Sequence, residues 1–130
     1  MKQIIQEILD NYRQAVLYKD KELMISLYHD DIFIYDVAGQ WALKGNQELI
    51  AMVEDWFKDI SLGEVVVEFS NLTIKSSHTY AFAYFDATFS KLKNDVVVQS
   101  VVDRFTLCLV FEDGWKIIHQ HASHPVGISH

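Results

Sequence analysis

Apolar residues recur at every third or fourth position near the N-terminus and again after residue 45. Residues 3–18 have this spacing, which predicts an amphipathic helix with one apolar face. Asp20 has the character of an N-cap for a second, short helix. Residues 45–60 repeat the helical spacing behind another capping candidate, Asn46. The expected inward residues of the last two helices are Leu23, Met24, Leu27 and Tyr28, and then Leu49, Ile50, Val53, Trp56, Phe57 and Ile60.

β-Branched and aromatic residues dominate the second half of the chain. They predict long strands over residues 64–76, 79–90, 96–111 and 115–123, separated by the turn segments SSH, LKND and EDG. A shorter strand is predicted over 31–37, before the turn AGQ. This order of elements predicts an α+β fold in which three helices pack on the concave face of a cone-shaped, curved antiparallel sheet.

Two predicted hairpin turns decide which strand residues share a face. A two-residue turn at Asp113-Gly114 pairs Glu112 with Trp115. The same register sets Arg104 opposite Ser123, Thr106 opposite His121, Cys108 opposite His119 and Asp103 opposite His124. A turn centred on Asn94-Asp95 sets Tyr84 beside Phe105 and Asp86 beside Asp103. Because side chains alternate along a strand, a single β-bulge would exchange these faces.

The two resulting faces differ in polarity. The more apolar face is assigned to the helices and carries Tyr84, Asp86, Asp103, Phe105, Leu107, Leu109 and Ile118. The other carries Ala83, Ala87, Arg104, Thr106, Cys108, Ile117, His119, His121 and Ser123. This second face is semi-apolar, and an exposed patch of this kind is usually covered by a partner. We therefore expect a homodimer through it, with Arg104, Thr106, Cys108, His119 and His121 in the interface.

The histidines near the C-terminus allow a second interpretation, a metal site. Cys108, His119 and His121 would be the ligands around an open position. Arg104 lies close by and would oppose a cation, so no metal and no cofactor is expected. His29, His78 and His130 are predicted to lie in turns or in the tail.

Composition narrows the classes of partner. The 130 residues are consistent with one domain over 1–130, and the net charge of −7 argues against a nucleic-acid partner, which needs a basic surface. That charge is compatible with a neutral or cationic small ligand. Cys108 is the only cysteine, so no internal disulfide can form and a reducing, cytoplasmic location is expected. No signal peptide or membrane-spanning segment is predicted.

Two aspartates are candidates for chemistry. Asp103 interrupts an apolar strand on the helix-covered face, where a carboxylate is costly unless it is paired or keeps its proton. Its alternative role is a structural pair with a neighbour such as His124. Asp36 follows the strand segment IFIY and would project at the mouth of the cone, and its alternative role is that of a turn-capping acid.

The layout and the tail GWKIIHQHASHP resemble the nuclear transport factor 2-like superfamily, in particular its SnoaL-like members. RFT followed by DGWKIIHQHAS is similar to that family's arginine-x-threonine and W-x-x-x-H-x-H-x-S strands. The tail also resembles the association domain of calcium/calmodulin-dependent protein kinase II. The pocket of that association domain is rich in arginine, whereas this chain has Asp86 and Leu107 at the corresponding places. An anionic ligand is therefore not expected. The fold hosts isomerases, dehydratases, hydrolases, cyclases and binding modules, so the resemblance implies the fold more strongly than an activity.

The segment NYRQAVLYKDKELMISLYHDDIFIYDVAG is similar to the start of Δ5-3-ketosteroid isomerase. The resemblance implies that Tyr12 donates to a substrate oxyanion and that Asp36 shuttles a proton. It also places that family's protonated aspartate at Asp103.

The expected function is binding of a small apolar carbonyl compound, with possible isomerase or lyase chemistry by Asp-mediated proton transfer. The alternative is a non-catalytic ligand-binding or oligomerisation module. The catalytic candidates are Asp36, Tyr12 and Asp103. The expected ligand-binding residues are Tyr28, Tyr35, Trp56, Phe57, Tyr84, Asp86 and Phe105.

Overall fold

The computed structural model describes residues 1–36 and 39–125, and its elements follow the predicted order. The helices are α1 (Lys2–Tyr18), α2 (Lys21–Ser26) and α3 (Gly45–Asp59). The strands are β1 (Tyr28–Tyr35), β2 (Leu43–Lys44), β3 (Glu64–Ser76), β4 (Tyr80–Lys93), β5 (Val96–Phe111) and β6 (Trp115–Ser123). The bounds of β3, β5 and β6 are those predicted, whereas the short strand β2 was not predicted. His130 and the end of the predicted strand 31–37 lie outside the described residues.

Of the two helix caps predicted from the sequence, one is correct and one is wrong. The Asp20 carboxylate accepts a hydrogen bond from the Leu23 backbone N–H at 3.1 Å, which confirms the cap of α2. At α3 the prediction of Asn46 as the cap is wrong, because the helix already begins at Gly45. The Glu48 carboxylate instead accepts from the backbone N–H of Lys44 at 2.9 Å, and so stabilises the start of this helix.

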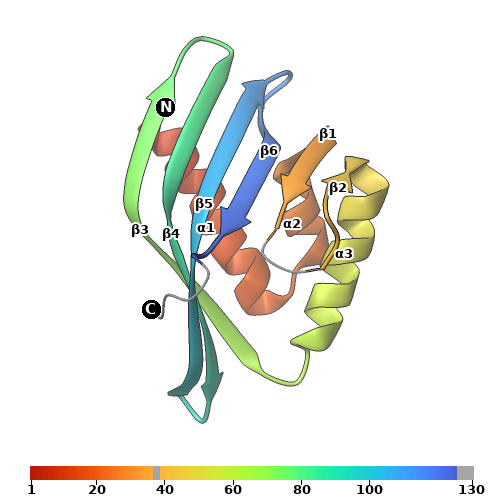
Figure 1. Ribbon diagram of the computed structural model, residues 1–130, viewed down its shortest axis with the longest axis vertical. Helices are drawn as coiled ribbons and strands as arrows, with labels where there is room; N and C mark the ends of the chain where they lie inside the picture. Colours follow the sequence, from red (N-terminus) through yellow and green to blue (C-terminus); the bar gives the residue numbers. More distant parts are fainter. Residues whose placement is uncertain (37–38, 126–130) are drawn as a thin grey trace.

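The strands form one six-stranded sheet in the order β2-β1-β6-β5-β4-β3. β1 runs parallel to β6, and all other neighbours are antiparallel. The sheet is curved, α1 crosses one of its faces, and α2 and α3 continue beside β1 and β2 (Figure 1). This is the predicted α+β architecture of three helices against a curved sheet. No helix of the described residues is long and apolar enough to cross a membrane.

The predicted β5–β6 register is confirmed from Arg104 to Cys108. Arg104 pairs with Ser123, Thr106 with His121 and Cys108 with His119. Nearer the turn the prediction is wrong, because Ile118 is an extra residue on β6 and Phe111, not Glu112, pairs with Trp115. The turn therefore spans three residues and includes Gly114 at φ +118°, a conformation that favours glycine. As a result Ile117 is buried on the helix side, and Ile118 is not.

The β4–β5 pairing contains the larger correction. The turn at Asn94-Asp95 is confirmed, with both residues at positive φ. Val98 is then an extra residue on β5, and beyond it Asp86 pairs with Arg104 and Tyr84 with Thr106. The bulge exchanges the two faces of β4. Ala83, Phe85 and Ala87 are buried under the helices, whereas Tyr84 and Asp86 point to the outer face.

The core lies between the helices and the inner face of the sheet. The predicted inward parity of β5 is confirmed, because Asp103, Phe105, Leu107 and Leu109 are all buried. On α1 the buried residues keep the predicted helical spacing: Ile5, Ile8, Leu9, Tyr12, Ala15 and Val16. Leu49, Val53 and Phe57 do the same on α3. One end of this space is not filled by side chains.

Candidate functional site

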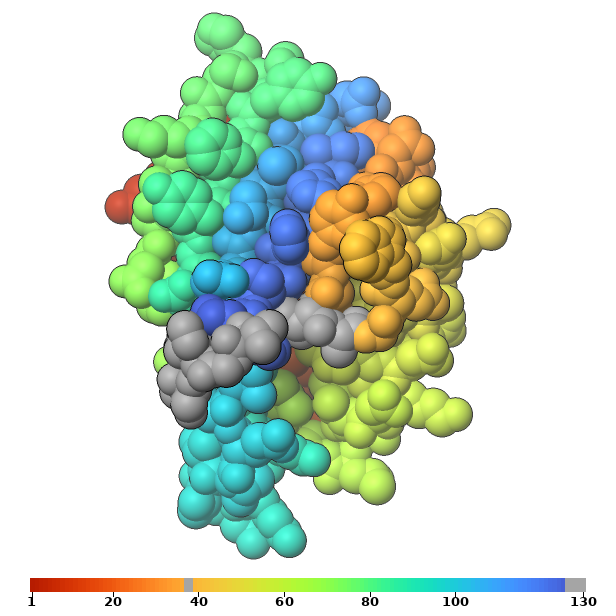
Figure 2. All heavy atoms as spheres, viewed as in Figure 1, coloured from red at the N-terminus to blue at the C-terminus, as the bar shows by residue number. Residues whose placement is uncertain are grey.

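A cavity of about 670 Å³ lies between α3 and the inner face of the sheet, beside Tyr12 of α1 and Met24 of α2. Figure 2 shows the surface hollowed between the tip of the β4–β5 hairpin and α3. Its described lining combines an apolar majority with acidic groups: Tyr12, Met24, Tyr28, Ile34, Asp36, Gly39, Gln40, Ala42, Leu43, Glu48, Ala51, Met52, Val53, Asp55, Trp56, Asp59, Phe89, Val101, Asp103, Phe105 and Gln120. An apolar cleft with a few polar groups is the usual form of a small-molecule site.

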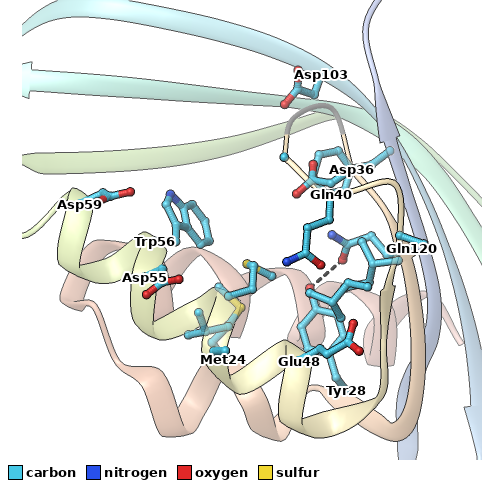
Figure 3. Close-up of a pocket in the computed structure, with 18 of the residues that line it drawn as sticks. Met24, Tyr28, Asp36, Gln40, Glu48, Asp55, Trp56, Asp59, Asp103 and Gln120 are labelled. Atoms are coloured by element: carbon cyan, nitrogen blue, oxygen red, sulfur yellow. Dashed lines mark hydrogen bonds between the residues drawn. The ribbon is translucent and has the colours of Figure 1, made fainter.

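One stripe of α3 forms a wall of the cavity. The lining residues Glu48, Met52, Asp55, Trp56 and Asp59 are spaced three or four apart and therefore lie along one side of the helix. They flank the buried stripe that anchors α3 to the core. Figure 3 shows Asp55, Trp56 and Asp59 projecting from this helix, with Asp36 and Asp103 across the cavity. The Trp56 ring is held against Phe57 and Phe89, with ring centroids 5.3 and 6.2 Å away.

Tyr12 forms the buried polar centre of the site. Only 7% of its surface is exposed, yet its hydroxyl hydrogen-bonds to none of the described residues and opens to the cavity. Burial, and then the nearby Tyr28, Asp36 and Asp103, raise the pKa of Tyr12 well above its usual value near 10. The hydroxyl therefore stays protonated at neutral pH and can donate to a ligand oxygen. The structure thus brings together the three residues that the resemblance marked as catalytic.

Tyr28 resembles Tyr12 in burial but not in bonding. Its hydroxyl donates to Gln120 Oε1 at 2.6 Å, a contact drawn as the dashed line in Figure 3. Burial, and then Asp36, raise the pKa of Tyr28, while the hydrogen bond from Tyr28 to Gln120 acts to lower it. Because this hydroxyl already has a protein partner, Tyr28 is a wall of the cavity and Tyr12 is its available donor.

Asp103 is paired with His124, the structural role that the sequence suggested as an alternative to catalysis. His124 Nδ1 lies 3.2 Å from Asp103 Oδ1, and the aspartate is buried while His124 is about half exposed. The contact suits a carboxylate accepting from the imidazole N–H, and it equally suits a carboxylic acid donating to the ring nitrogen. Asp103 is therefore both a lining residue and one half of a pair that fixes its orientation.

Six of the predicted site residues line the cavity, and four do not. Those that line it are Tyr12, Tyr28, Asp36, Trp56, Asp103 and Phe105. Phe57 is buried in the core behind Trp56 and does not reach the lining. The placement of Tyr84 and Asp86 in the pocket is wrong because of the Val98 bulge. Tyr35 is also misplaced, since its ring packs against His119 and His121 on the outer face.

The sequence did not mark five polar lining residues: Gln40, Glu48, Asp55, Asp59 and Gln120. Gln120 could have been found from the register, because it lies between the outward His119 and His121 and must point inward. The acids of α3 carry a weaker signal, since acids one turn apart usually mark a solvated helix face. Only the position of α3 relative to the β4–β5 hairpin makes them part of a cavity.

The histidines on the outer face are positioned by strand contacts. His119 Nδ1 lies 2.7 Å from the Phe33 carbonyl oxygen, and His121 packs against the Tyr35 ring. Within residues 1–36 and 39–125, no group of three His, Cys, Asp or Glu side chains is placed to hold a metal ion. Burial raises the pKa of the Cys108 thiol, which disfavours the thiolate that a metal requires. His29 was predicted to lie in a turn, but it lies in β1 and pairs with Glu112, whereas His78 lies in the β3–β4 turn as predicted.

The two buried tyrosines predict a loss of stability at high pH. Their pKa values are raised in the folded state, so above about pH 10 the unfolded chain releases these protons first and the free energy of unfolding falls as pH rises. Each tyrosine should contribute a slope of up to about 1.4 kcal/mol per pH unit. Urea unfolding between pH 9 and pH 11.5 measures it. Tyr28→Phe should remove its share of the slope, whereas Tyr18→Phe, at an exposed position, should leave the slope unchanged. Equal slopes in wild type and Tyr28→Phe would contradict the prediction.

Comparison with known proteins identifies the family and the fold. A family model described as a SnoaL-like domain matches residues 5–127. An NTF2-like protein of unknown function from Pseudomonas putida is 26% identical, with a TM-score of 0.84 over 96% of this chain and 87% of that one. An NTF2-like protein with a cystatin-like fold from Novosphingobium aromaticivorans is 14% identical, with a TM-score of 0.83 over 98% and 84%.

A protein described as a calcium/calmodulin-dependent protein kinase II association domain, from Xanthomonas campestris, is 16% identical. Its TM-score is 0.79 over 95% of this chain and 87% of that one. No match was found among curated proteins. The SnoaL-like family and the cystatin-like fold are therefore shown. The expected resemblances to NTF2-like proteins and to the kinase association domain are confirmed.

Proposed function

Because this chain belongs to the SnoaL-like domain family, we propose that its cavity binds a small, largely apolar carbonyl compound and moves a proton on the carbon next to the carbonyl group. The observation that carries the proposal is the Tyr12 hydroxyl, which is buried, protonated and open to the cavity beside Asp36 and Asp103. A donor of this kind is suited to an oxygen on which negative charge develops. The single, partly buried Cys108 is compatible with the reducing location expected from the sequence.

In the proposed reaction each group has one role. The substrate carbonyl oxygen accepts a hydrogen bond from Tyr12, and Asp36 takes a proton from the neighbouring carbon. The electrons of that C–H bond form an enolate, whose oxygen Tyr12 stabilises. Asp36 then returns the proton to the same or another carbon. Asp103 lies near Tyr12, where burial and then the charge of Asp103 raise the pKa of the Tyr12 hydroxyl, which keeps this donor protonated. His124 holds the Asp103 carboxyl group in position.

The test is hydrogen–deuterium exchange next to a carbonyl group. The probe is 2-tetralone, a bicyclic ketone small enough for the cavity, incubated in D₂O with the protein and followed by proton NMR. We expect the protein to accelerate loss of the α-proton signal above the rate in buffer alone. If 2-tetralone binds and no acceleration occurs, the proton-transfer role is overturned and binding alone remains.

A second role, homodimerisation, is supported by the outer face of the sheet. Phe82 and Tyr84 are 42% and 48% exposed there and stack on each other. They lie beside Thr106, Cys108 and the histidines of β6 on neighbouring strands. An aromatic surface of this kind is typical of an interface between proteins. The proposed interface residues remain Arg104, Thr106, Cys108, His119 and His121.

Thr106→Arg tests the proposed dimer, because Thr106 lies on the outer face between Tyr84 and His121. We expect light scattering to give twice the chain mass of 15.1 kDa for the wild type. The variant should be a monomer at micromolar concentration, since a charge buried at the centre of an interface commonly weakens binding by about 100-fold or more. Gln6→Arg, on the exposed side of α1, should remain dimeric. A monomeric wild type, or a dimeric Thr106→Arg, would overturn this role.

A further inference from the structure

We infer that the ligand carries a positive charge: an apolar body bearing a protonated amine, whose ammonium group is held between Asp55, Trp56 and Asp59 on α3. The inference rests on the proposed function and adds the chemical class of the ligand. It goes beyond apolar binding because the acids of α3 lie apart from the carbonyl end of the cavity at Tyr12.

The charge of the lining is the first argument. Among the described lining residues the charged ones are all acids, Asp36, Glu48, Asp55, Asp59 and Asp103, and none is Lys, Arg or His. The net charge of −7 reinforces the local negative potential. An anionic ligand would have to enter against this potential, whereas a cation is attracted by it.

The surroundings of Asp55 and Asp59 are the second argument. Glu54, the residue before Asp55, faces away from the cavity and is paired with Lys21 at 3.1 Å. In the described part of the chain, no basic side chain lies within ion-pairing distance of Asp55 or Asp59. Glu54, on the outer side of α3, is thus paired with a lysine, whereas Asp55 and Asp59 have no basic partner among the described residues.

Trp56 supplies a second kind of cation contact at the same place. Its indole projects into the cavity from the same side of α3 as the two acids, as Figure 3 shows, and packing against Phe57 and Phe89 holds the ring. Indole is the strongest of the aromatic side chains in attracting a cation. An indole beside carboxylates can bind an ammonium group that keeps part of its hydration shell.

Tyr12 provides an independent sign that a polar ligand atom enters the cavity. Its surface is only 7% exposed, and its hydroxyl, which has no hydrogen-bond partner among the described residues, is accessible only from the cavity, where a ligand oxygen or water can accept from it. The cavity therefore offers the Tyr12 donor, beside Asp36 and Asp103, at one end and the acids of α3 at the other. A ligand with an oxygen at one end and an ammonium group at the other would satisfy both.

The positive charge also fits the proposed reaction. When Asp36 takes the proton, Asp36 becomes neutral and the ligand oxygen gains the negative charge. Near Asp103, a ligand of net charge −1 would be opposed by repulsion between like charges. A ligand that starts as a cation instead becomes a neutral zwitterion, so its own ammonium group offsets the charge of its enolate.

The experiment compares naphthalenes of nearly the same shape and different charge. The probes are 1-naphthylmethylamine, 1-naphthalenemethanol and 1-naphthoate, and isothermal titration calorimetry measures their binding. We expect the amine to bind about tenfold more tightly than the alcohol, and the carboxylate to bind more weakly than both. In the double variant Asp55→Asn/Asp59→Asn, the advantage of the amine should fall to about twofold while the alcohol binds as before. Glu54→Gln removes one of the negative charges of α3, on its outer side, and should keep the full advantage.

Each outcome separates the two proposals. Equal binding of amine and alcohol, or tighter binding of the carboxylate, overturns the positive charge and leaves the cavity as an apolar site. An amine preference that survives in the double variant overturns the assignment to α3. Failure of all three probes to bind overturns this inference, while exchange of 2-tetralone still decides the proposed function. Failure of 2-tetralone exchange alone leaves the charge preference standing.

Discussion

Replacing Asp36 by asparagine is expected to slow α-proton exchange of 2-tetralone by about 10²–10⁴-fold, the usual contribution of a general base. Asparagine keeps the size of the side chain, but it cannot accept the proton. Asp36 is exposed at the end of β1 while it lines the cavity, so the free energy of unfolding should change by less than about 1 kcal/mol. Proton NMR in D₂O measures the exchange, and urea unfolding measures the stability.

Asp31→Asn is the matched control for this variant. Asp31 lies on the same strand, is exposed and does not line the cavity, so the same change of charge should leave exchange within about twofold of wild type, as expected for a surface substitution. If Asp36→Asn and Asp31→Asn both exchange at the wild-type rate, Asp36 is not the base. The structural alternative, a turn-capping acid, would then be the better account of Asp36.

The fold could be predicted from the sequence because its strongest signals are local. Helical spacing marked α1 and α3, and runs of β-branched residues marked β3, β5 and β6 with their observed bounds. The turns at Asn94-Asp95 and Gly114 then set the alternation on β5, where one polar residue, Asp103, stands out among apolar ones. A register derived from a short turn is reliable for as long as the ladder has no bulge.

The site could be predicted only in part, for two physical reasons. On β4, alanines alternate with aromatic residues, and alanine is compatible with either face. The bulge at Val98 therefore determines on which face of the sheet Tyr84 and Asp86 lie, and no local sequence pattern predicts such a bulge. On α3, Asp55 and Asp59 have the pattern of a solvated helix. Their place at a cavity depends on the curvature of the sheet opposite, which is a property of the whole fold.

Tyr12 and Tyr28 allow a functional hydroxyl to be separated from a structural one. Both rings are buried and both hydroxyls stay protonated, but among the described residues only the Tyr28 hydroxyl has a protein partner, Gln120 Oε1. Removing one partner of a buried hydrogen bond leaves the other unsatisfied and costs about 1–3 kcal/mol. Removing a hydroxyl that has no protein partner carries no such cost. The same substitution should therefore have opposite consequences at the two positions.

Tyr12→Phe is expected to slow exchange of 2-tetralone by about 10²–10³-fold, the loss usual for one donor to a developing oxyanion. Its free energy of unfolding should stay within about 0.5 kcal/mol of wild type or rise. Tyr28→Phe should instead lose about 1–3 kcal/mol of stability, because Gln120 is left unpaired, and should retain most of the exchange activity. NMR exchange and urea unfolding of the two variants measure both effects. If Tyr12→Phe is destabilised as much as Tyr28→Phe and exchanges normally, Tyr12 is a structural residue and the proposed oxyanion donor is wrong.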